Sequence, residues 1–141
     1  MNHAATPVSV RPYAVSVSVS VSILVVGSIN MDLVARCPRI PAPGETILGS
    51  DFTQSPGGKG ANGATAAARL LSARMGGRVA MLGAVGRDDH GAALVRNLGV
   101  RGVDAERVLR LDGVPTGVAL IAVADDGENS IVVVPGANGR L

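Results

Sequence analysis

The chain has 141 residues and a formal net charge of +2, and Tyr13 and Phe52 are its only aromatic residues. This length suits one modest domain, whose core must be built from aliphatic side chains. Because the basic residues are scattered and no aromatic stacking platform exists, we expect no nucleic-acid partner. No apolar run approaches the length that crosses a membrane, so we expect no membrane partner. The single cysteine, Cys37, indicates a small buried residue and a reducing compartment, the cytoplasm.

The first 22 residues form a low-complexity segment with a Val-Ser alternation over residues 15–22. A period of two is typical of a half-buried strand, but such a segment can also be a disordered extension. As a secretory signal it lacks a continuous apolar centre and a clear cleavage site. We therefore interpret residues 1–22 as a dispensable tail and residues 23–141 as the folded part.

Several elements are predicted in the first half of the folded part. Residues 23–27 form a continuous apolar run that ends in glycine, which is typical of a buried parallel strand. Residues 28–32 then form a polar exit, and Pro38, Pro41, Pro43 and Gly44 mark a loop. The alternating character of residues 46–54 predicts a short strand.

Two helices and a second buried strand follow. Residues 60–74 predict a helix, because apolar residues recur at spacings of three and four, at Ala64, Ala67, Ala68 and Leu71. Residues 79–83 predict the strand. Residues 90–98 predict the second helix, capped by Asp88 or Asp89 and closed by Gly99. The charged cluster at residues 87–90 could hold a catalytic His-Asp pair, but a helix cap is the favoured interpretation.

The alternation of strand and helix predicts an α/β fold with a parallel sheet and right-handed crossovers. The pattern then changes, because residues 118–123 and 130–134 are β-rich runs on either side of a polar turn. This arrangement predicts a hairpin. Asp125, Asp126 and Glu128 in the turn are interpreted as solvated residues and not as a metal loop. Residues 136–139 predict a further turn.

The glycine-rich segment at residues 55–62 precedes the first helix and is the strongest local indication of a small-molecule site. A mononucleotide P-loop is excluded, because Lys59 is followed by Gly60 where Ser or Thr is needed. Gly58, Gly60 and Gly63 match the dinucleotide fingerprint as a string. The residues before them are polar and end in proline, and no acid follows at the required distance, so this match is weak.

Seven motifs occur in an order and spacing that closely resemble the N-terminal half of the ribokinase-like members of the PfkB family of sugar and nucleoside kinases. They cover the chain from Ile23 to Leu141 and lie at residues 27–32, 41–46, 57–62, 85–91, 116–121, 127–129 and 136–138. The resemblance implies a three-layer α/β sandwich with a parallel central sheet and a small β lid. It also implies ATP-dependent phosphorylation of a sugar, foremost D-ribose at its 5-position. The implied cofactors are ATP and Mg²⁺, with a monovalent cation such as K⁺.

Asn30 and Asp32 stand two residues apart in an extended segment, so their side chains point the same way. They follow the first strand at its carboxyl end, where open α/β sheets bind ligands. A carboxylate and an amide can together bind several sugar hydroxyls. The resemblance assigns sugar binding to a set of six residues, namely Asn30, Asp32, Gly57, Gly58, Lys59 and Asn62. Gly63 departs from the family, which commonly has a larger polar residue there.

The resemblance also assigns the strands at about residues 45–55 and 116–134 to a lid over the sugar. Apolar side chains alternate along the hairpin, at Ile121, Val123, Ile131 and Val133, and one such face could cover the sugar. Closure would exclude water from the reaction. The family pairs these lids into a homodimer, whereas an ordinary edge hairpin is the alternative explanation.

Phosphoryl transfer needs a base that orients the nucleophile and a site that holds the ATP phosphates. In the family these lie in a C-terminal half with a Gly-Ala-Gly-Asp-type motif, which this chain lacks. We therefore expect no catalytic residue and no metal ligand here, and an inactive chain. Two alternatives stay open: a non-catalytic module that binds sugar or dimerises, and a dinucleotide-binding protein.

Overall fold

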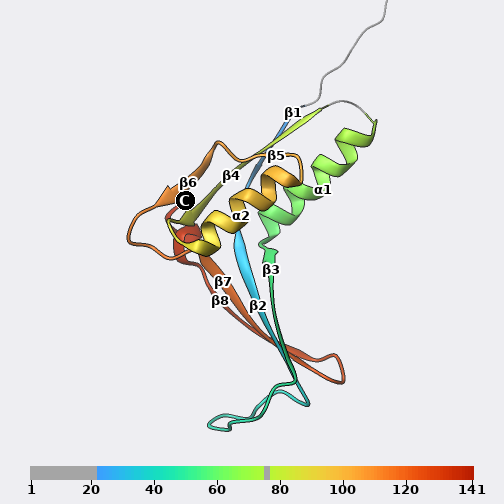
Figure 1. Ribbon diagram of the computed structural model, residues 1–141, viewed down its shortest axis with the longest axis vertical. Helices are drawn as coiled ribbons and strands as arrows, with labels where there is room; N and C mark the ends of the chain where they lie inside the picture. Colours follow the sequence, from blue (N-terminus) through green and yellow to red (C-terminus); the bar gives the residue numbers. More distant parts are fainter. Residues whose placement is uncertain (1–21, 75–76) are drawn as a thin grey trace, which may run out of the picture.

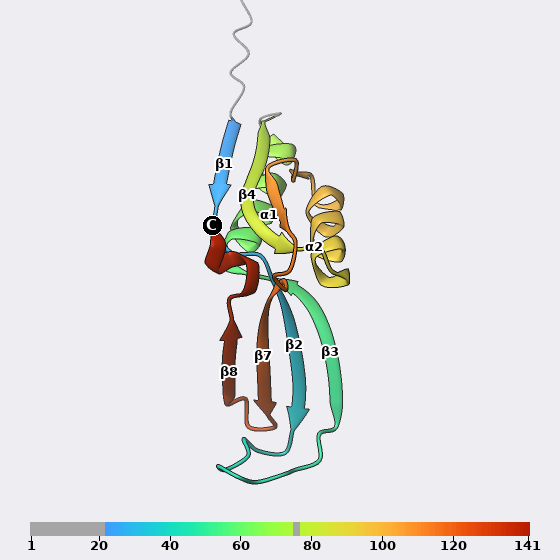
Figure 2. The same cartoon turned by 90° about the vertical axis from the view of Figure 1, so that its left-hand side faces the viewer.

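The computed structural model describes residues 22–74 and 77–141, so the predicted tail, apart from Ser22, lies outside them. Two sheets lie end to end, with the helices beside the first sheet (Figures 1 and 2). The first sheet contains β1 (Ser22–Val26), β4 (Arg78–Gly86), β5 (Val103–Asp104) and β6 (Val108–Leu111). The second, which we call the lid sheet, has the order β3 (Asp51–Gly57), β2 (Asn30–Cys37), β7 (Gly117–Ala124), β8 (Asn129–Val134).

The first sheet confirms the predicted parallel α/β architecture. Its central strand, β4, pairs in parallel with β1, β5 and β6. The helices α1 (Lys59–Arg74) and α2 (Asp89–Val100) pack against this sheet from the same side, and the short 3₁₀ helix η1 (Gly136–Arg140) lies on the other (Figure 2). The apolar residues of α1 that were expected to face inward do so: Ala64, Ala68 and Leu71 are buried and Ala67 packs against the core. Within the described residues, η1 is the only helical element of the third layer.

The first strand was predicted correctly as parallel but wrongly as buried. Leu24 and Val26 are 52% and 59% exposed. The reason is its position, because β1 pairs only with β4 among the described strands and forms the edge of the sheet.

The lid sheet differs from the prediction in two respects. Residues 30–37, of which the first three were expected to form a polar exit, make strand β2 at the centre of this sheet. The strand expected at residues 46–54, within the lid range of 45–55, runs instead from Asp51 to Gly57 and includes Pro56. Proline is tolerated because β3 is an edge strand. The hairpin of β7 and β8 is antiparallel, as predicted.

The second helix confirms one predicted end and corrects the other. Asp88 caps α2, since its side chain accepts a hydrogen bond from the Gly91 N–H at 2.8 Å. Gly99 does not close the helix, which continues to Val100 with Arg101 as its C-cap. The left-handed residue after it is Gly102, with φ of +80°. Neither described helix is long and apolar enough to cross a membrane.

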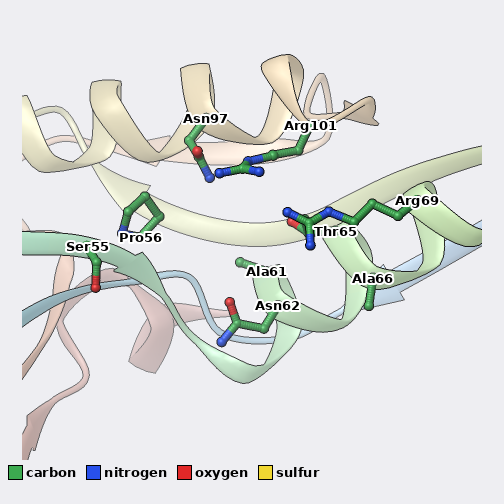
Figure 3. Close-up of a pocket in the computed structure, with 9 residues that line it drawn as sticks. All are labelled: Ser55, Pro56, Ala61, Asn62, Thr65, Ala66, Arg69, Asn97 and Arg101. Carbon is green, nitrogen blue, oxygen red and sulfur yellow. The ribbon is translucent and has the colours of Figure 1, made fainter.

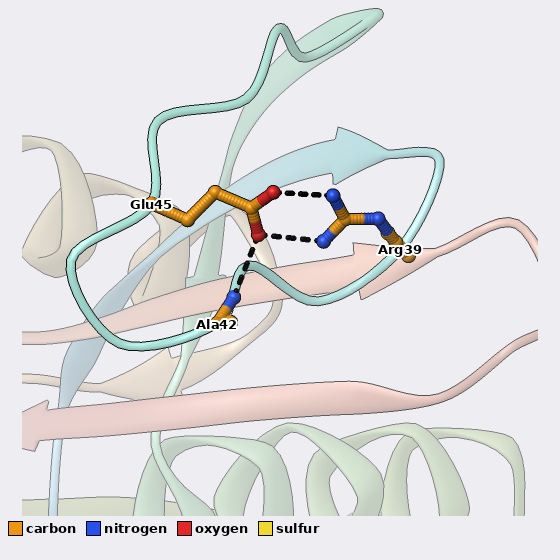
Figure 4. Close-up of polar contacts among 3 residues, drawn as sticks. All are labelled: Arg39, Ala42 and Glu45. Carbon is orange, nitrogen blue, oxygen red and sulfur yellow. Dashed lines mark hydrogen bonds and ion pairs between the residues drawn. The ribbon is translucent and has the colours of Figure 1, made fainter.

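The loop between β2 and β3 is closed by an ion pair at the far end of the lid sheet (Figure 4). Both carboxylate oxygens of Glu45 accept hydrogen bonds from Arg39, and one also accepts the Ala42 N–H at 2.9 Å. The hydrogen bonds from Arg39 and then from Ala42 lower the pKa of Glu45 to about 2.

We expect NMR titration of the wild-type chain to show the Glu45 carboxyl group titrating near pH 2. Arg39→Gln should raise this pKa, because the substitution removes the charged hydrogen-bond donor. Arg36→Gln is the matched control, because Arg36 is an exposed arginine of β2 that pairs with Asp51 in the strand register. An ordinary carboxyl pKa for Glu45 in the wild-type chain would contradict the ion pair.

Candidate functional site

A cavity of about 440 Å³ lies where the first sheet meets the lid sheet. Five of the six residues predicted for the site line it, namely Asn30, Asp32, Gly58, Lys59 and Asn62. The rest of the lining consists of Ser28, Val133, Pro135 and Asn138. These residues come from β2, from the start of α1 and from the segments beside them. The fold therefore brings together residues that stand far apart in the chain.

Gly57, the sixth predicted residue, does not line the cavity but makes room for Asp32. It is buried, and it pairs across the strands with Asn30. A Cβ atom at Gly57 would lie 2.2 Å from Oδ2 of Asp32, so a larger residue there would force the carboxylate to move. Burial raises the pKa of Asp32 above its ordinary value. The Asp32 carboxylate is thus placed close to the backbone of β3 and partly out of water.

Asn30 is held in place by a residue that was not among the predicted site residues. The Asn138 side chain donates to Oδ1 of Asn30 at 2.8 Å and to the Ile29 carbonyl at 3.1 Å. It also accepts the Ile29 N–H at 2.9 Å. Asn138 therefore joins η1 to the start of β2. The Gly-Ala-Asn motif at residues 136–138 was one of the seven motifs shared with the family, but Asn138 was not among the predicted site residues.

The glycine-rich segment positions the start of α1 by contacts within the protein. Gly58 has φ of +92° and would clash through a Cβ atom with the Ser28 carbonyl at 2.6 Å. The N–H groups of Ala61 and Asn62 donate to the carbonyls of Ser28 and Gly58. The Ala61 N–H is therefore bonded within the protein, and the Asn62 N–H makes the first i→i−4 bond of α1. Lys59 and Asn62 are exposed and reach the cavity by their side chains.

The four predicted lid residues all lie on the face of the lid sheet that carries Asp32. Strand pairing puts Ala119 beside both Asp32 and Val133, and side chains two residues apart share a face, so Ile121, Val123 and Ile131 follow on that face. Only Val133 of the four lines the cavity. The other three lie further along the strands toward the hairpin turn.

Comparison with known proteins identifies the family. The model of the "pfkB family carbohydrate kinase" matches residues 21–141. The chain belongs to the pfkB family of carbohydrate kinases. It is 47% identical over 120 residues to the ribokinase of Bacillus subtilis, a match that covers 85% of this chain and 39% of that protein. It is 45% identical to the ribokinase of Lactococcus lactis, over 83% of this chain and 37% of the relative.

Solved ribokinase structures share the fold of this pfkB-family chain. The ribokinase of Arabidopsis thaliana complexed with ribose and ATP matches with a TM-score of 0.73 and 36% identity, over 85% of this chain and 38% of that one. The ribokinase of Giardia lamblia gives a TM-score of 0.78 and 41% identity, over 87% and 36%. The chain thus spans less than two fifths of the length of these relatives. The α/β fold with a lid is that of ribokinases.

Two features of the described residues in this pfkB-family chain bear on cofactor binding, namely metal ligands and open backbone donors. Within residues 22–74 and 77–141, no three His, Cys, Asp or Glu side chains are grouped so that they could hold a metal ion. The N–H groups of Ala61 and Asn62 at the start of α1 are bonded within the protein.

Thr116 and Asp88 connect α2 to the lid strand β7 of this family member. Thr116 is buried, and its hydroxyl and N–H donate to the two carboxylate oxygens of Asp88 at 2.6 and 2.8 Å. Burial raises the pKa of Asp88, but hydrogen bonds from Thr116 and Gly91 and the charge of His90 outweigh it, so this pKa lies below its ordinary value. The network fixes the residue that precedes Gly117, at the start of the lid strand.

We expect Asp88→Asn to lower the free energy of unfolding by about 1–3 kcal/mol, because buried donors of Thr116 lose a charged acceptor. Because the pKa of Asp88 is depressed in the folded state, its stabilising effect is present above the unfolded pKa and disappears as pH falls through the folded pKa. Urea unfolding of the variant and the wild type at several pH values measures both effects. Asp89→Asn, at the exposed neighbouring position, is the control. Equal stability of Asp88→Asn and wild type at neutral pH would contradict this role.

Proposed function

We propose that this chain forms the sugar-binding part of an ATP-dependent sugar kinase that converts D-ribose to D-ribose 5-phosphate. The observation that carries the proposal is the cavity that gathers Asn30, Asp32, Lys59 and Asn62 beneath the lid sheet. Its support is the 47% identity to a ribokinase and the similarity to a ribokinase complexed with ribose and ATP. ATP, Mg²⁺ and a monovalent cation such as K⁺ would be bound by parts of the family fold outside this chain. The buried thiol of Cys37 fits a cytoplasmic enzyme.

The cavity residues supply the groups that a sugar needs. The carboxylate of Asp32 can accept hydrogen bonds from two adjacent hydroxyls, and Lys59 can only donate. Since Nδ2 of Asn138 donates to Oδ1 of Asn30, the Asn30 carbonyl is directed toward η1 and its NH₂ group is left to donate to a sugar oxygen. Val133 gives the cavity an apolar wall on the lid side. These residues would bind and orient the sugar and exclude water, whereas phosphoryl transfer needs groups that they do not provide.

Two measurements on the 141-residue chain test the proposal. Isothermal titration calorimetry should give saturable binding of D-ribose and none of L-arabinose at the same concentration. A coupled assay for ADP release with D-ribose and ATP should give no turnover. Binding of neither sugar would overturn the sugar site, and clear turnover by the chain alone would overturn the assignment of catalysis to other parts of the fold.

A chimaera tests the proposed kinase activity. Residues 23–141 replace the matching segment of the Bacillus subtilis ribokinase, which is 47% identical. Because the site residues lie in this segment, the chimaera should phosphorylate D-ribose, and Asp32→Asn in it should raise the KM for D-ribose. The exposed β1 edge is the place where the rest of the fold would pair with this chain. A well-folded but inactive chimaera would contradict the proposal.

A non-catalytic module that dimerises is the second candidate, and one surface favours it. The lid face opposite to Asp32 carries a groove of about 350 Å³ lined mainly by apolar residues, among them Leu33, Phe52, Leu120 and Val132. Phe52 and Val132 are each 58% exposed. Pairing of two such faces would give a homodimer through the lid. Sedimentation equilibrium should then give a dimer that Leu120→Ser converts to a monomer, whereas a monomeric wild type would overturn this candidate.

A dinucleotide-binding function has less support. The strand before Gly58 is β3, which pairs antiparallel with β2 in the lid sheet. The fingerprint requires a buried strand of a parallel sheet at that point. Thermal stabilisation of the chain by NAD, with no effect of D-ribose, would favour dinucleotide binding over sugar binding.

A further inference from the structure

A second cavity of about 370 Å³ lies in the groove between α1 and α2 (Figure 3). Arg69 and Thr65 reach it from α1, and Asn97 and Arg101 reach it from α2 and its C-cap. Ser55, near the end of β3, also lines it. Figure 3 shows the guanidinium groups of Arg69 and Arg101 extending from the two helices toward the same space.

The charged side chains that line this groove are all basic. Its lining contains two arginines and no acidic residue. Helix α1 has no acidic residue along its whole length, and the one acid of α2, Asp89, lies at the opposite end of that helix from Arg101. The remaining polar lining residues carry amide and hydroxyl groups, which can donate hydrogen bonds to an anion. Guanidinium groups together with neutral hydrogen-bond donors are the groups that commonly bind phosphate oxygens.

We propose that the α1–α2 groove binds a phosphate oxyanion, either free or as the phosphate group of a small metabolite. The groove adjoins the sugar cavity without being part of it. Asn62 lines both cavities, and Ser55 of the groove pairs in the strand register with Asp32 of the sugar cavity. The anion site needs neither a sugar nor ATP, so it stands or falls independently of the proposed kinase function.

Calorimetric titration of the 141-residue chain with inorganic phosphate, at constant ionic strength set by chloride, tests the site. We expect saturable binding with a stoichiometry near one. Arg101→Gln and Arg69→Gln should each weaken it by about tenfold or more, because each removes a charged hydrogen-bond donor. Arg96→Gln is the matched control, since Arg96 is an exposed arginine of α2 that does not line the groove. It should leave the affinity unchanged.

Parallel titrations with glycerol 3-phosphate and with glycerol distinguish the two sources of phosphate. Tighter binding of the ester than of inorganic phosphate indicates a phosphorylated metabolite, and the reverse indicates free phosphate. The melting temperature of each variant shows whether it is folded. Absence of saturable phosphate binding by the wild type overturns the proposal. So does an equal loss for Arg96→Gln and Arg101→Gln, because that result would reflect net charge alone.

Discussion

Asp32→Asn is expected to weaken D-ribose binding by about 10- to 100-fold, since a hydrogen bond to a charged group contributes roughly 1.5–3 kcal/mol. The same substitution should leave the melting temperature unchanged or raise it. Burial raises the pKa of Asp32, so the folded protein favours the protonated form and the ionised carboxylate opposes folding at neutral pH. Loss of binding without loss of stability distinguishes a functional carboxylate from a structural one.

The sign of the pH dependence follows from the same shift. As pH falls through the raised pKa of Asp32, the carboxylate gains a proton, loses its charge and becomes a weaker acceptor for sugar hydroxyls, so ribose affinity should fall. Protein stability should not fall with the protonation of Asp32, because a raised folded-state pKa makes proton uptake favour the folded form. Asp51→Asn is the control, because Asp51 lies on the same lid face at its far end and does not line the cavity. Wild-type ribose affinity in Asp32→Asn would remove Asp32 from the site.

The parts of the fold that sequence predicted well are those with a strong local period. Helix α1 begins one residue earlier than expected, and the β7–β8 hairpin has the predicted pairing. In both, the hydrophobic spacing itself reports which side chains face the protein interior. The exposure of β1 had no such signal, because an apolar run indicates burial while the number of neighbouring strands decides it.

Strand β2 was missed because its pattern is mixed. Its polar residues Asn30, Asp32 and Arg36 share one face, and the first two belong to the cavity, so their polarity reflects the site and not a loop. Asn138 was missed for a related reason. Its bonds to Ile29 and Asn30 join residues more than 100 positions apart, and no local pattern reports such a contact.

The glycine-rich segment at residues 55–62 did not reveal which groups its glycines accommodate. Glycines allow close approach, but the sequence does not say to what. Gly57 makes room for the Asp32 carboxylate, and Gly60 makes room for the backbone of Gly27. Five of the six predicted residues line the cavity, and the glycines among and beside them are explained by close packing within the protein.

Gly60→Ala is expected to destabilise the chain, whereas Gly63→Ala in the same helix should stabilise it. A Cβ atom at Gly60 would lie 2.7 Å from the Gly27 carbonyl carbon and 2.9 Å from its Cα, where β1 ends. Such overpacking typically lowers the free energy of unfolding by about 1–3 kcal/mol. No atom lies within 4 Å of a Cβ atom built at Gly63, so alanine there should add about 0.5–1 kcal/mol of helix stability.

The comparison isolates the contact, because both substitutions remove the same backbone freedom from the unfolded chain. Urea unfolding followed by far-UV circular dichroism measures the two free energies. Equal stability of the two variants would show that the start of α1 can move away from β1 freely. A less stable Gly60→Ala would show that alanine forces the start of α1 away from β1 at a cost, which would also shift Lys59 and Asn62 relative to the cavity. D-ribose binding should then weaken in Gly60→Ala and persist in Gly63→Ala, which ties the packing of two glycine backbones to the proposed sugar site.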